Sequence, residues 1–392
     1  MTEDVFIVAA RRTPIGAFQG ALSGATAPQL GAAAVRAAVG DARVSGEQID
    51  EVILGCVLPA GLGQAPARQA AIAAGLPHSL PATTINKVCG SGMRSAMLGC
   101  DSIRAGSARI VIAGGFESMT NAPYLLPKAR QGYRMGHGEV LDHMFYDGLQ
   151  NPYDGQMMGH FADLTAAKYR FTRADQDAYA AESVRRAQAA CGNGAFAAEL
   201  APVTVKGRKG DQLVERDEPP FNCDISKIAH LKPAFAKDGT VTAASSSSIA
   251  DGAAALVLMS DSAARAAGAT PLARVVAYAS HAQAPEWFTT APAGAISKVL
   301  ERAGWSAAEV DLYEINEAFA VVTMASMRDV GLDHARVNVN GGACALGHPI
   351  GASGARILVT LLHALKGRGG RRGVASLCIG GGEATAVAIE IA

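Results

Sequence analysis

The sequence has little charge, few aromatic residues and no excess of either charge sign. Of its 392 residues, 18% are charged and 5% are aromatic, and 35 basic residues balance 35 acidic ones. A nucleic-acid-binding protein usually carries a basic excess, which this chain lacks. No polybasic amphipathic stretch indicates an anionic membrane surface, and no apolar run approaches the roughly 18 residues of a membrane span. The expected partner is therefore a small molecule, with neither nucleic acid nor membrane.

The cysteines lack the pattern of a structural framework. There are seven of them, widely spaced and without a C-x-x-C pair, so they predict neither a disulfide scaffold nor a zinc site. Residues 1–5 are acidic, unlike the basic start of a secretory signal. We therefore expect a reducing, cytoplasmic compartment and no metal, with each cysteine either a small core residue or a reactive thiol.

Short apolar runs alternate with alanine-rich segments of helical spacing. Runs at residues 5–8, 52–54, 110–113, 253–258, 374–377 and 386–389 are too short for helices and are typical of buried strands. Apolar faces at helical spacing occur within residues 93–103 and 357–365. This alternation predicts an α/β fold whose sheets are covered by helices.

The two ends of the chain form a weak internal repeat. Residues 85–115 and 339–381 each predict a strand, a glycine-rich turn, a helix, a second strand and a double glycine. Two similar halves would bring both turns to one central site, although chance similarity between two βαβ units is an alternative. Residues 121–244 are richer in charge, His, Tyr and Met and predict an inserted domain. The four serines at 245–248 suit a linker or a substrate-lining loop equally well.

Four residues with chemical potential stand at the ends of predicted buried elements. Cys89 occupies a turn before a helix, where unpaired N–H groups and the helix dipole would lower the thiol pKa below its free value of about 8.5. His348 precedes a helix, Cys378 follows a strand and Asn316 begins a helix, and singly each has an ordinary structural explanation. Their convergence, mostly beside glycine clusters, predicts a reaction site.

The chain resembles the thiolase family, the acetyl-CoA acetyltransferases and 3-ketoacyl-CoA thiolases, along essentially its whole length. The resemblance is carried by residues 88–92 (Val-Cys-Gly-Ser-Gly), 316–319 (Asn-Glu-Ala-Phe), 347–354 (Gly-His-Pro-Ile-Gly-Ala-Ser-Gly) and 378–382 (Cys-Ile-Gly-Gly-Gly). It implies a duplicated thiolase fold with mixed sheets covered by helices. The N-terminal half would comprise residues 1–120 and 245–268, the inserted loop domain residues 121–244, and the C-terminal half residues 269–392. It also implies acyl-CoA substrates, a homodimer or homotetramer, and no metal or other cofactor.

The resemblance also implies a role for each candidate. Cys89 would take the acyl group, His348 would accept its proton, and Cys378 would remove a proton from the α-carbon of acetyl-CoA. Asn316 would hold a water at the enolate oxygen, and the N–H groups of Cys89 and Gly380 would bind the tetrahedral intermediate. A side chain at position 380 would obstruct that backbone donor. The reaction implied is the reversible Claisen condensation of two acetyl-CoA to acetoacetyl-CoA and CoA through acyl-Cys89.

Contacts to coenzyme A and the acyl chain carry over by position. The matching residues are Ser247, Leu149, Met157, Phe235, Ala243, Phe288, Ala318 and Phe319. Met157 stands where many acetoacetyl-specific members have histidine, which suits longer chains, whereas Phe288 replaces a methionine and would shorten the acyl pocket. A degradative 3-ketoacyl-CoA thiolase of broader chain length is therefore an alternative.

Other protein classes fit the motifs less well. In papain-like cysteine hydrolases the asparagine follows the histidine, whereas Asn316 precedes His348. A β-ketoacyl synthase has no counterpart of Cys378 as a base. A non-catalytic thiolase-like acyl-CoA or lipid-binding protein would tend to lose a catalytic group, and all four are present. The basic run at residues 206–209 is interpreted as a solvated or subunit-contact face.

Overall fold

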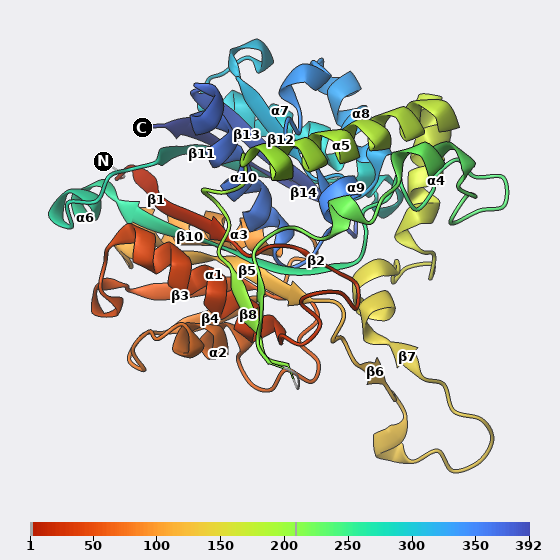
Figure 1. The fold of residues 1–392 in the computed structure, drawn as a ribbon, viewed down its shortest axis with the longest axis horizontal. Coiled ribbons are helices and arrows are strands. Elements are labelled where there is room, and N and C mark those ends of the chain that lie inside the picture. Colours follow the sequence, from red (N-terminus) through yellow and green to blue (C-terminus); the bar gives the residue numbers. More distant parts are fainter. Residues whose placement is uncertain (1–2, 208–209) are drawn as a thin grey trace.

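A computed structural model describes residues 3–207 and 210–392 (Figure 1). Arg208 and Lys209, half of the basic run, lie outside the described residues. Each apolar run predicted as a strand lies within a strand of one mixed ten-stranded sheet. The strands are β1 (Val5–Arg12), β2 (Gly16–Ala17), β3 (Glu51–Gly55), β4 (Ala82–Ile85), β5 (Ile110–Ser118), β10 (Ala250–Ser260), β11 (Ala273–Ala282), β12 (Leu312–Ile315), β13 (Arg372–Ile379) and β14 (Glu383–Ile391).

The sheet consists of two sets of strands with the same pairing pattern. In the first set, β1 is antiparallel to β10, β10 is antiparallel to β5, and β5 is parallel to β3. In the second, β11, β14, β13 and β12 repeat this order and these directions. The sets join where β1 pairs with β11 through Phe6 and Ile7, so the sheet is continuous. The weak sequence repeat therefore corresponds to a structural duplication.

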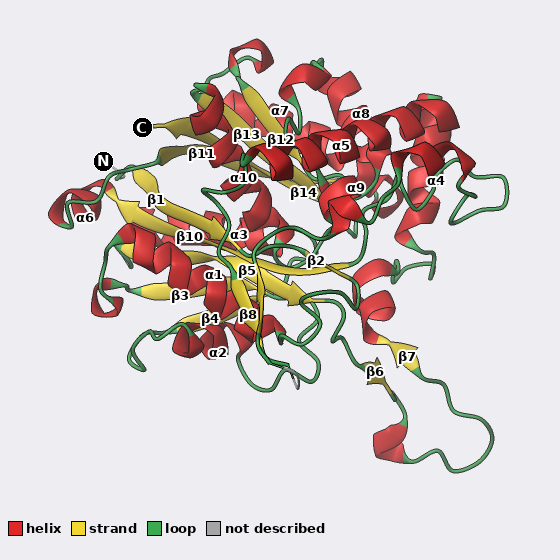
Figure 2. Ribbon diagram, viewed as in Figure 1, coloured by secondary structure: helices red, strands yellow, loops and turns green. Residues whose placement is uncertain are grey.

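Helices form layers between and outside the two sets of strands (Figure 2). In the central layer, α3 (Ser91–Arg104) packs with α10 (Ser353–Arg368), and both contact strands of both sets. The outer layers contain α1 (Ala27–Ala42) and α2 (Pro66–Ala73) on the first set and α7 (Ala291–Ala303) on the second. The two sets of strands are further accompanied by the helices α6 (Asp261–Ala266), α8 (Ala320–Val330) and α9 (Ala343–Leu346). The apolar faces predicted at residues 93–103 and 357–365 are the buried faces of α3 and α10.

The segment between β5 and β10 adds two longer helices and two small hairpins. The helices are α4 (Met158–Tyr169) and α5 (Arg173–Asn193), and α5 begins with a capping box formed by Thr172 and Asp175. The hairpins are β6 (Tyr124–Leu125) with β7 (Leu141–Asp142), which projects from the body in Figure 1, and β8 (Val203–Val205) with β9 (Gln212–Val214). A π-helix, η3 (Met144–Leu149), follows β7.

Short 3₁₀ segments connect the longer elements. They are η1 (Gly46–Gln48), η2 (Ala129–Gln131), η4 (Pro219–Phe221), η5 (Ile225–His230), η6 (Pro285–Thr290), η7 (Ala307–Glu309) and η8 (His334–Arg336). Over residues 3–207 and 210–392, none of the helices has the length and apolar character needed to cross a bilayer.

Candidate active site

The two glycine-rich turns predicted by the repeat meet at the beginnings of α3 and α10. Cys89 lies in the turn between β4 and α3, and His348 lies between α9 and α10. The turns are in close contact, because a Cβ on Gly92, at the start of α3, would lie 3.0 Å from the Gly351 carbonyl oxygen of the His348 turn. The duplication therefore places a cysteine from one half beside a histidine from the other.

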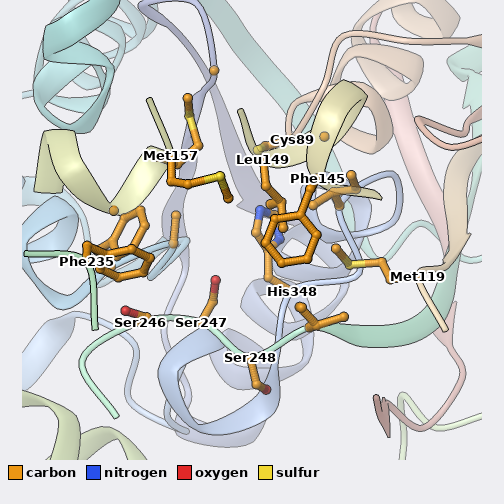
Figure 3. Close-up of a pocket in the computed structure, with 18 of the residues that line it drawn as sticks. Cys89, Met119, Phe145, Leu149, Met157, Phe235, Ser246, Ser247, Ser248 and His348 are labelled. Carbon is orange, nitrogen blue, oxygen red and sulfur yellow. The ribbon is translucent and has the colours of Figure 1, made fainter. Parts of the chain in front are cut away.

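A cavity of about 210 Å³ opens at this meeting point (Figure 3). Most of the residues predicted from the motifs line it, namely Cys89, His348, Gly380, Ser247, Leu149, Met157, Phe235, Phe288, Ala318 and Phe319. The lining also includes residues that the motifs did not single out: Met119, Phe145, Gly148, Met158, Gly159, Ser246, Ser248, Ile249 and Ile350. Three of the four serines thus line the cavity, so the run is not a free linker, and Ser246, Ser247 and Ser248 follow one side of the cavity in Figure 3.

Three predicted residues lie outside the lining. Ala243 is exposed, on the loop before the serines. Cys378 is fully buried at the end of β13 and packs in one apolar cluster with the lining residues Phe288 and Phe319, directly behind the cavity wall. Asn316, just after β12, is also fully buried, and among the residues described neither of its amide atoms has a hydrogen-bond partner.

The Cys89 turn is held in a strained shape by its neighbours. Val88 has a positive φ of 46°, which is costly for a β-branched residue and is typical of functional sites. Asn86 Oδ1 accepts a hydrogen bond from the Val88 N–H at 2.8 Å. Ser91 Oγ accepts from the Lys87 N–H at 2.8 Å and donates to the Val88 carbonyl at 2.7 Å. These bonds stabilise the turn that presents the sulfur to the cavity.

The expectation of a lowered thiol pKa at Cys89 is wrong. Burial of the sulfur raises the pKa of Cys89 to about 11. The backbone N–H groups of Gly380 and of Cys89 itself donate toward the sulfur and oppose this shift, but desolvation of the charged form outweighs them. Cys89 is therefore a neutral thiol at neutral pH, and the two N–H groups converge on the sulfur.

His348 is held as a neutral imidazole. Burial, followed by the nearby Arg356 guanidinium, lowers the pKa of His348 to about 3. Its Nδ1 lies 2.5 Å from Ser353 Oγ, and its backbone N–H donates to the Ser248 carbonyl at 3.0 Å. With a neutral thiol beside a neutral imidazole, the free protein does not hold a thiolate–imidazolium pair.

The second cysteine is influenced by the first. Burial raises the pKa of Cys378 well above its ordinary value, and a negative charge on Cys89 would raise it further. Such an interaction requires the two groups to be close in a poorly solvated environment. A thiolate on Cys378 would therefore form more easily while Cys89 is uncharged, as a thiol or a thioester.

A buried carboxylate that the motifs had not singled out connects the two halves. Glu117 of β5 accepts hydrogen bonds from the N–H groups of Val57 and Gly351, both at 2.9 Å, and of Leu58 at 3.1 Å. Burial raises the pKa of Glu117 to about 7 against these three donors. Because Gly351 belongs to the His348 turn, Glu117 fixes that turn to the first half.

A second buried carboxylate ties the inserted segment to the site. Glu317 accepts from Tyr179 Oη at 2.8 Å and Ser183 Oγ at 2.7 Å, both on α5. It also accepts from Asn338 Nδ2 at 2.8 Å and the Cys344 N–H at 3.0 Å. An acidic residue between Asn316 and two apolar residues was the sequence signal for this buried centre.

Across the described ranges, no three His, Cys, Asp or Glu side chains are grouped to hold a metal ion.

The fold and the site together define a class of protein: a duplicated α/β protein in which a cysteine from one half and a histidine from the other face a single cavity. Comparison with known families agrees: the thiolase N-terminal domain matches residues 5–262 and the thiolase C-terminal domain matches residues 269–391. The chain belongs to the thiolase family.

Named relatives match along nearly the whole chain. The chain is 51% identical over 389 residues to the acetyl-CoA acetyltransferase of Pseudomonas aeruginosa, covering 99% of each. It is 51% identical over 390 residues to acetyl-CoA acetyltransferase 1 of Arabidopsis thaliana, covering 99% of this chain and 94% of the relative. It is 50% identical over 386 residues to the acetyl-CoA acetyltransferase of Escherichia coli, covering 98% of each.

Proposed function

We propose that this protein is an acetyl-CoA acetyltransferase, which condenses two acetyl-CoA molecules reversibly to acetoacetyl-CoA and CoA through an acetyl-Cys89 intermediate. The observation that carries this proposal is that Cys89, His348 and Gly380, from both halves, line one cavity. Three relatives of about the same length and about half-identical sequence bear the same name.

In the first half-reaction, Cys89 Sγ attacks the thioester carbonyl of acetyl-CoA. Because the thiol pKa is about 11, its proton must leave as the new C–S bond forms, and the Nε2 atom of His348 accepts it. The carbonyl oxygen becomes an oxyanion held by the N–H groups of Cys89 and Gly380. When the C–S bond to coenzyme A breaks, His348 returns the proton to the departing thiolate and CoA-SH leaves.

In the second half-reaction, the Cys378 thiol first passes its proton to Nε2 of His348, and the resulting thiolate removes a proton from the methyl group of a second acetyl-CoA. The enolate oxygen receives hydrogen bonds from the protonated Nε2 of His348 and from a water held by Asn316, whose buried amide is unpartnered within the described chain and suits that task. The enolate carbon attacks the acetyl-Cys89 carbonyl, the C–S bond breaks, and acetoacetyl-CoA forms. The departing Cys89 thiolate takes the proton from Nε2 of His348, so Cys89 and Cys378 are both thiols again and His348 is neutral.

The pantetheine arm would follow the apolar wall of the cavity. Leu149, Phe235, Ala318 and Phe319 supply apolar contact, and Phe235 and Phe319 pack edge-to-face with 5.9 Å between ring centres. Ser247 supplies a polar contact there. Ala243, being exposed, would meet only a part of the coenzyme outside the cavity.

The alternative is a thiolase that cleaves longer 3-ketoacyl-CoA substrates. The observation that favours it is Met157 in the cavity wall, where a flexible apolar side chain could adapt to a longer chain. Phe288 opposes it, because this buried aromatic side chain takes up space in the same wall.

The remaining proposals concern organisation. We propose an N-terminal half of residues 1–120 and 245–268, an inserted domain of residues 121–244, and a C-terminal half of residues 269–392. We also propose a homodimer or homotetramer that acts in the cytoplasm and needs no metal or further cofactor.

The direct test is to incubate the protein with acetyl-CoA and search the Cys89 peptide for an acetyl adduct by mass spectrometry. The adduct is expected in the wild type and in a Cys191→Ser control. The Cys89→Ser variant should lack both the adduct and the activity. An unmodified Cys89 peptide, combined with an active Cys89→Ser variant, rejects the proposal.

A further inference from the structure

His348 meets the cavity with one ring nitrogen bonded and the other free. Nδ1 lies 2.5 Å from Ser353 Oγ, and Nε2 has no hydrogen-bond partner in residues 3–207 and 210–392. His348 is 5% exposed and Ser353 is 1% exposed, so water competes little for the Nδ1 contact. The tautomer of His348 therefore depends on what Ser353 does with its single hydroxyl proton.

The Ser353 hydroxyl has a backbone carbonyl as its hydrogen-bond acceptor. Oγ lies 2.9 Å from the Pro349 carbonyl oxygen, four residues earlier, and donates to it. A hydroxyl with its proton so placed offers only lone pairs to its other neighbour, so Nδ1 must carry the hydrogen. The Nε2 lone pair is then free on the side of the cavity.

An equivalent serine in the other half has the same two-way bonding. Ser91 precedes Gly92 at the start of α3, as Ser353 precedes Gly354 at the start of α10. Ser91 Oγ donates to the Val88 carbonyl at 2.7 Å and accepts from the Lys87 N–H at 2.8 Å. In the second half, the ring N–H of His348 takes the place of that backbone N–H.

We propose that Ser353 is a positioning residue that holds His348 in the Nδ1–H tautomer with the Nε2 lone pair facing the cavity. The proposal rests on the proposed role of His348 as proton acceptor for Cys89. The bond also serves the protonated state, because the imidazolium keeps the same Nδ1–H to Oγ contact after Nε2 has taken the proton. No rearrangement of the loop is needed between the two states.

The test reads the tautomer itself by ¹⁵N NMR of the histidine rings in the full-length protein, with the His348 signals assigned from their absence in His348→Gln. The wild type is expected to show a protonated Nδ1 and an unprotonated Nε2. Ser353→Ala should increase the Nε2–H population and lower kcat roughly 10- to 100-fold with KM within about threefold. Ser353→Thr, which keeps the hydroxyl, should restore the wild-type tautomer.

Ser326→Ala is the matched control. Ser326 is fully buried and donates to the Val322 carbonyl, four residues earlier, at 2.7 Å, so its removal costs the same kind of bond without touching a ring. In the Ser326→Ala variant, the His348 tautomer and kcat should be those of the wild type. An Nε2–H tautomer in the wild type, or an unchanged tautomer and kcat in Ser353→Ala, overturns the proposal. The failure of the proposed function would instead appear as a missing acetyl adduct on Cys89.

Discussion

Gly92 and Gly354 occupy equivalent places in the two halves, and each lies where the backbone of the other's helix passes. A Cβ on Gly92 would come 2.7 Å from the Ala355 nitrogen, and a Cβ on Gly354 would come 2.3 Å from the Met93 nitrogen. The first turns of α3 and α10 therefore touch backbone to backbone. This contact brings the Cys89 and His348 turns, each just ahead of one of these helices, to a common cavity.

Gly354→Ala should separate the two helices, because the new methyl group meets main chain that cannot turn aside. We expect a loss of about 1–3 kcal/mol in the free energy of unfolding. We also expect a fall in kcat of at least roughly 100-fold, since misplacement by about an ångström has that effect. Denaturant unfolding and steady-state assays measure the two.

Gly367→Ala is the control in the same helix. A Cβ there meets no atom within 4 Å, so helix propensity alone should make the variant neutral or up to about 1 kcal/mol more stable. Equal stability of the Gly354→Ala and Gly367→Ala proteins would show that the close approach is not needed.

The raised pKa of Cys89 predicts how its alkylation depends on pH. With the pKa at about 11, the thiolate fraction grows about tenfold per pH unit between pH 7 and 10. The rate of iodoacetamide labelling of the Cys89 peptide, followed by mass spectrometry, should rise accordingly without a plateau. A plateau below pH 8 would instead reveal a preformed thiolate–imidazolium pair and contradict the assignment of two neutral groups.

Acid should destabilise the fold through His348. Its pKa is lowered from an ordinary 6.5 to about 3, so the unfolded chain binds this proton more readily than the folded protein between those values. The free energy of unfolding is unaffected above pH 6.5 and falls as the pH drops toward 3, by about 2 kcal/mol from this group at pH 5. Denaturant unfolding at pH 5 and pH 7 should show a smaller difference for His348→Gln than for the wild type. An equal difference in both proteins would rule out the burial of neutral imidazole as a cause.

Much of the fold and half of the site could be predicted from local patterns. The apolar runs became strands and the faces at residues 93–103 and 357–365 became buried, because burial at a regular spacing is encoded within each segment. The shared cavity of Cys89 and His348 could also be predicted, because the repeat that positions these two residues is visible in the sequence.

The remaining features depend on partners far along the chain. Glu117 bonds Gly351 across 234 positions, and no local pattern pairs them. The sign of the Cys89 pKa shift was wrong because the position at a helix start indicates only the donors near the sulfur, whereas the desolvation that outweighs them depends on the folded packing. Similarly, a Cβ on Gly380 would meet Met158 and Val88 only at 3.7 Å or more, so the packing of the protein alone does not require glycine there.

Cys378→Ala should separate the two half-reactions. Because Cys378 packs behind the cavity wall and Cys89 remains in place, the variant should still acquire the acetyl group on Cys89. It should fail to exchange the methyl protons of acetyl-CoA with deuterium from solvent, which NMR or mass spectrometry detects. Cys100→Ala, which removes another buried thiol, from α3, should retain exchange. Normal exchange in Cys378→Ala would assign the base to another group.

The acyl-chain length accepted by the cavity should depend on Phe288. This side chain is 3% exposed and lies edge-to-face with Phe161, 6.3 Å between ring centres, so it has little freedom to move aside for a longer substrate. Phe288→Leu should open the wall to about two further methylene groups. At about 0.8 kcal/mol per buried methylene, the kcat/KM for thiolysis of an eight-carbon 3-ketoacyl-CoA should rise roughly tenfold relative to acetoacetyl-CoA.

Phe145→Leu is the control that separates the effect of removing the side chain at position 288 from the effect of losing any aromatic ring in the cavity wall. Phe145 also lines the cavity but is 41% exposed, so its replacement should leave the chain-length ratio unchanged. Thiolysis rates over substrates of four to sixteen carbons measure all three proteins. If the wild type already cleaves the eight-carbon substrate as well as acetoacetyl-CoA, Phe288 does not limit the cavity. The apolar Met157 side of the wall would then set the specificity, and the longer-chain thiolase would be the better description.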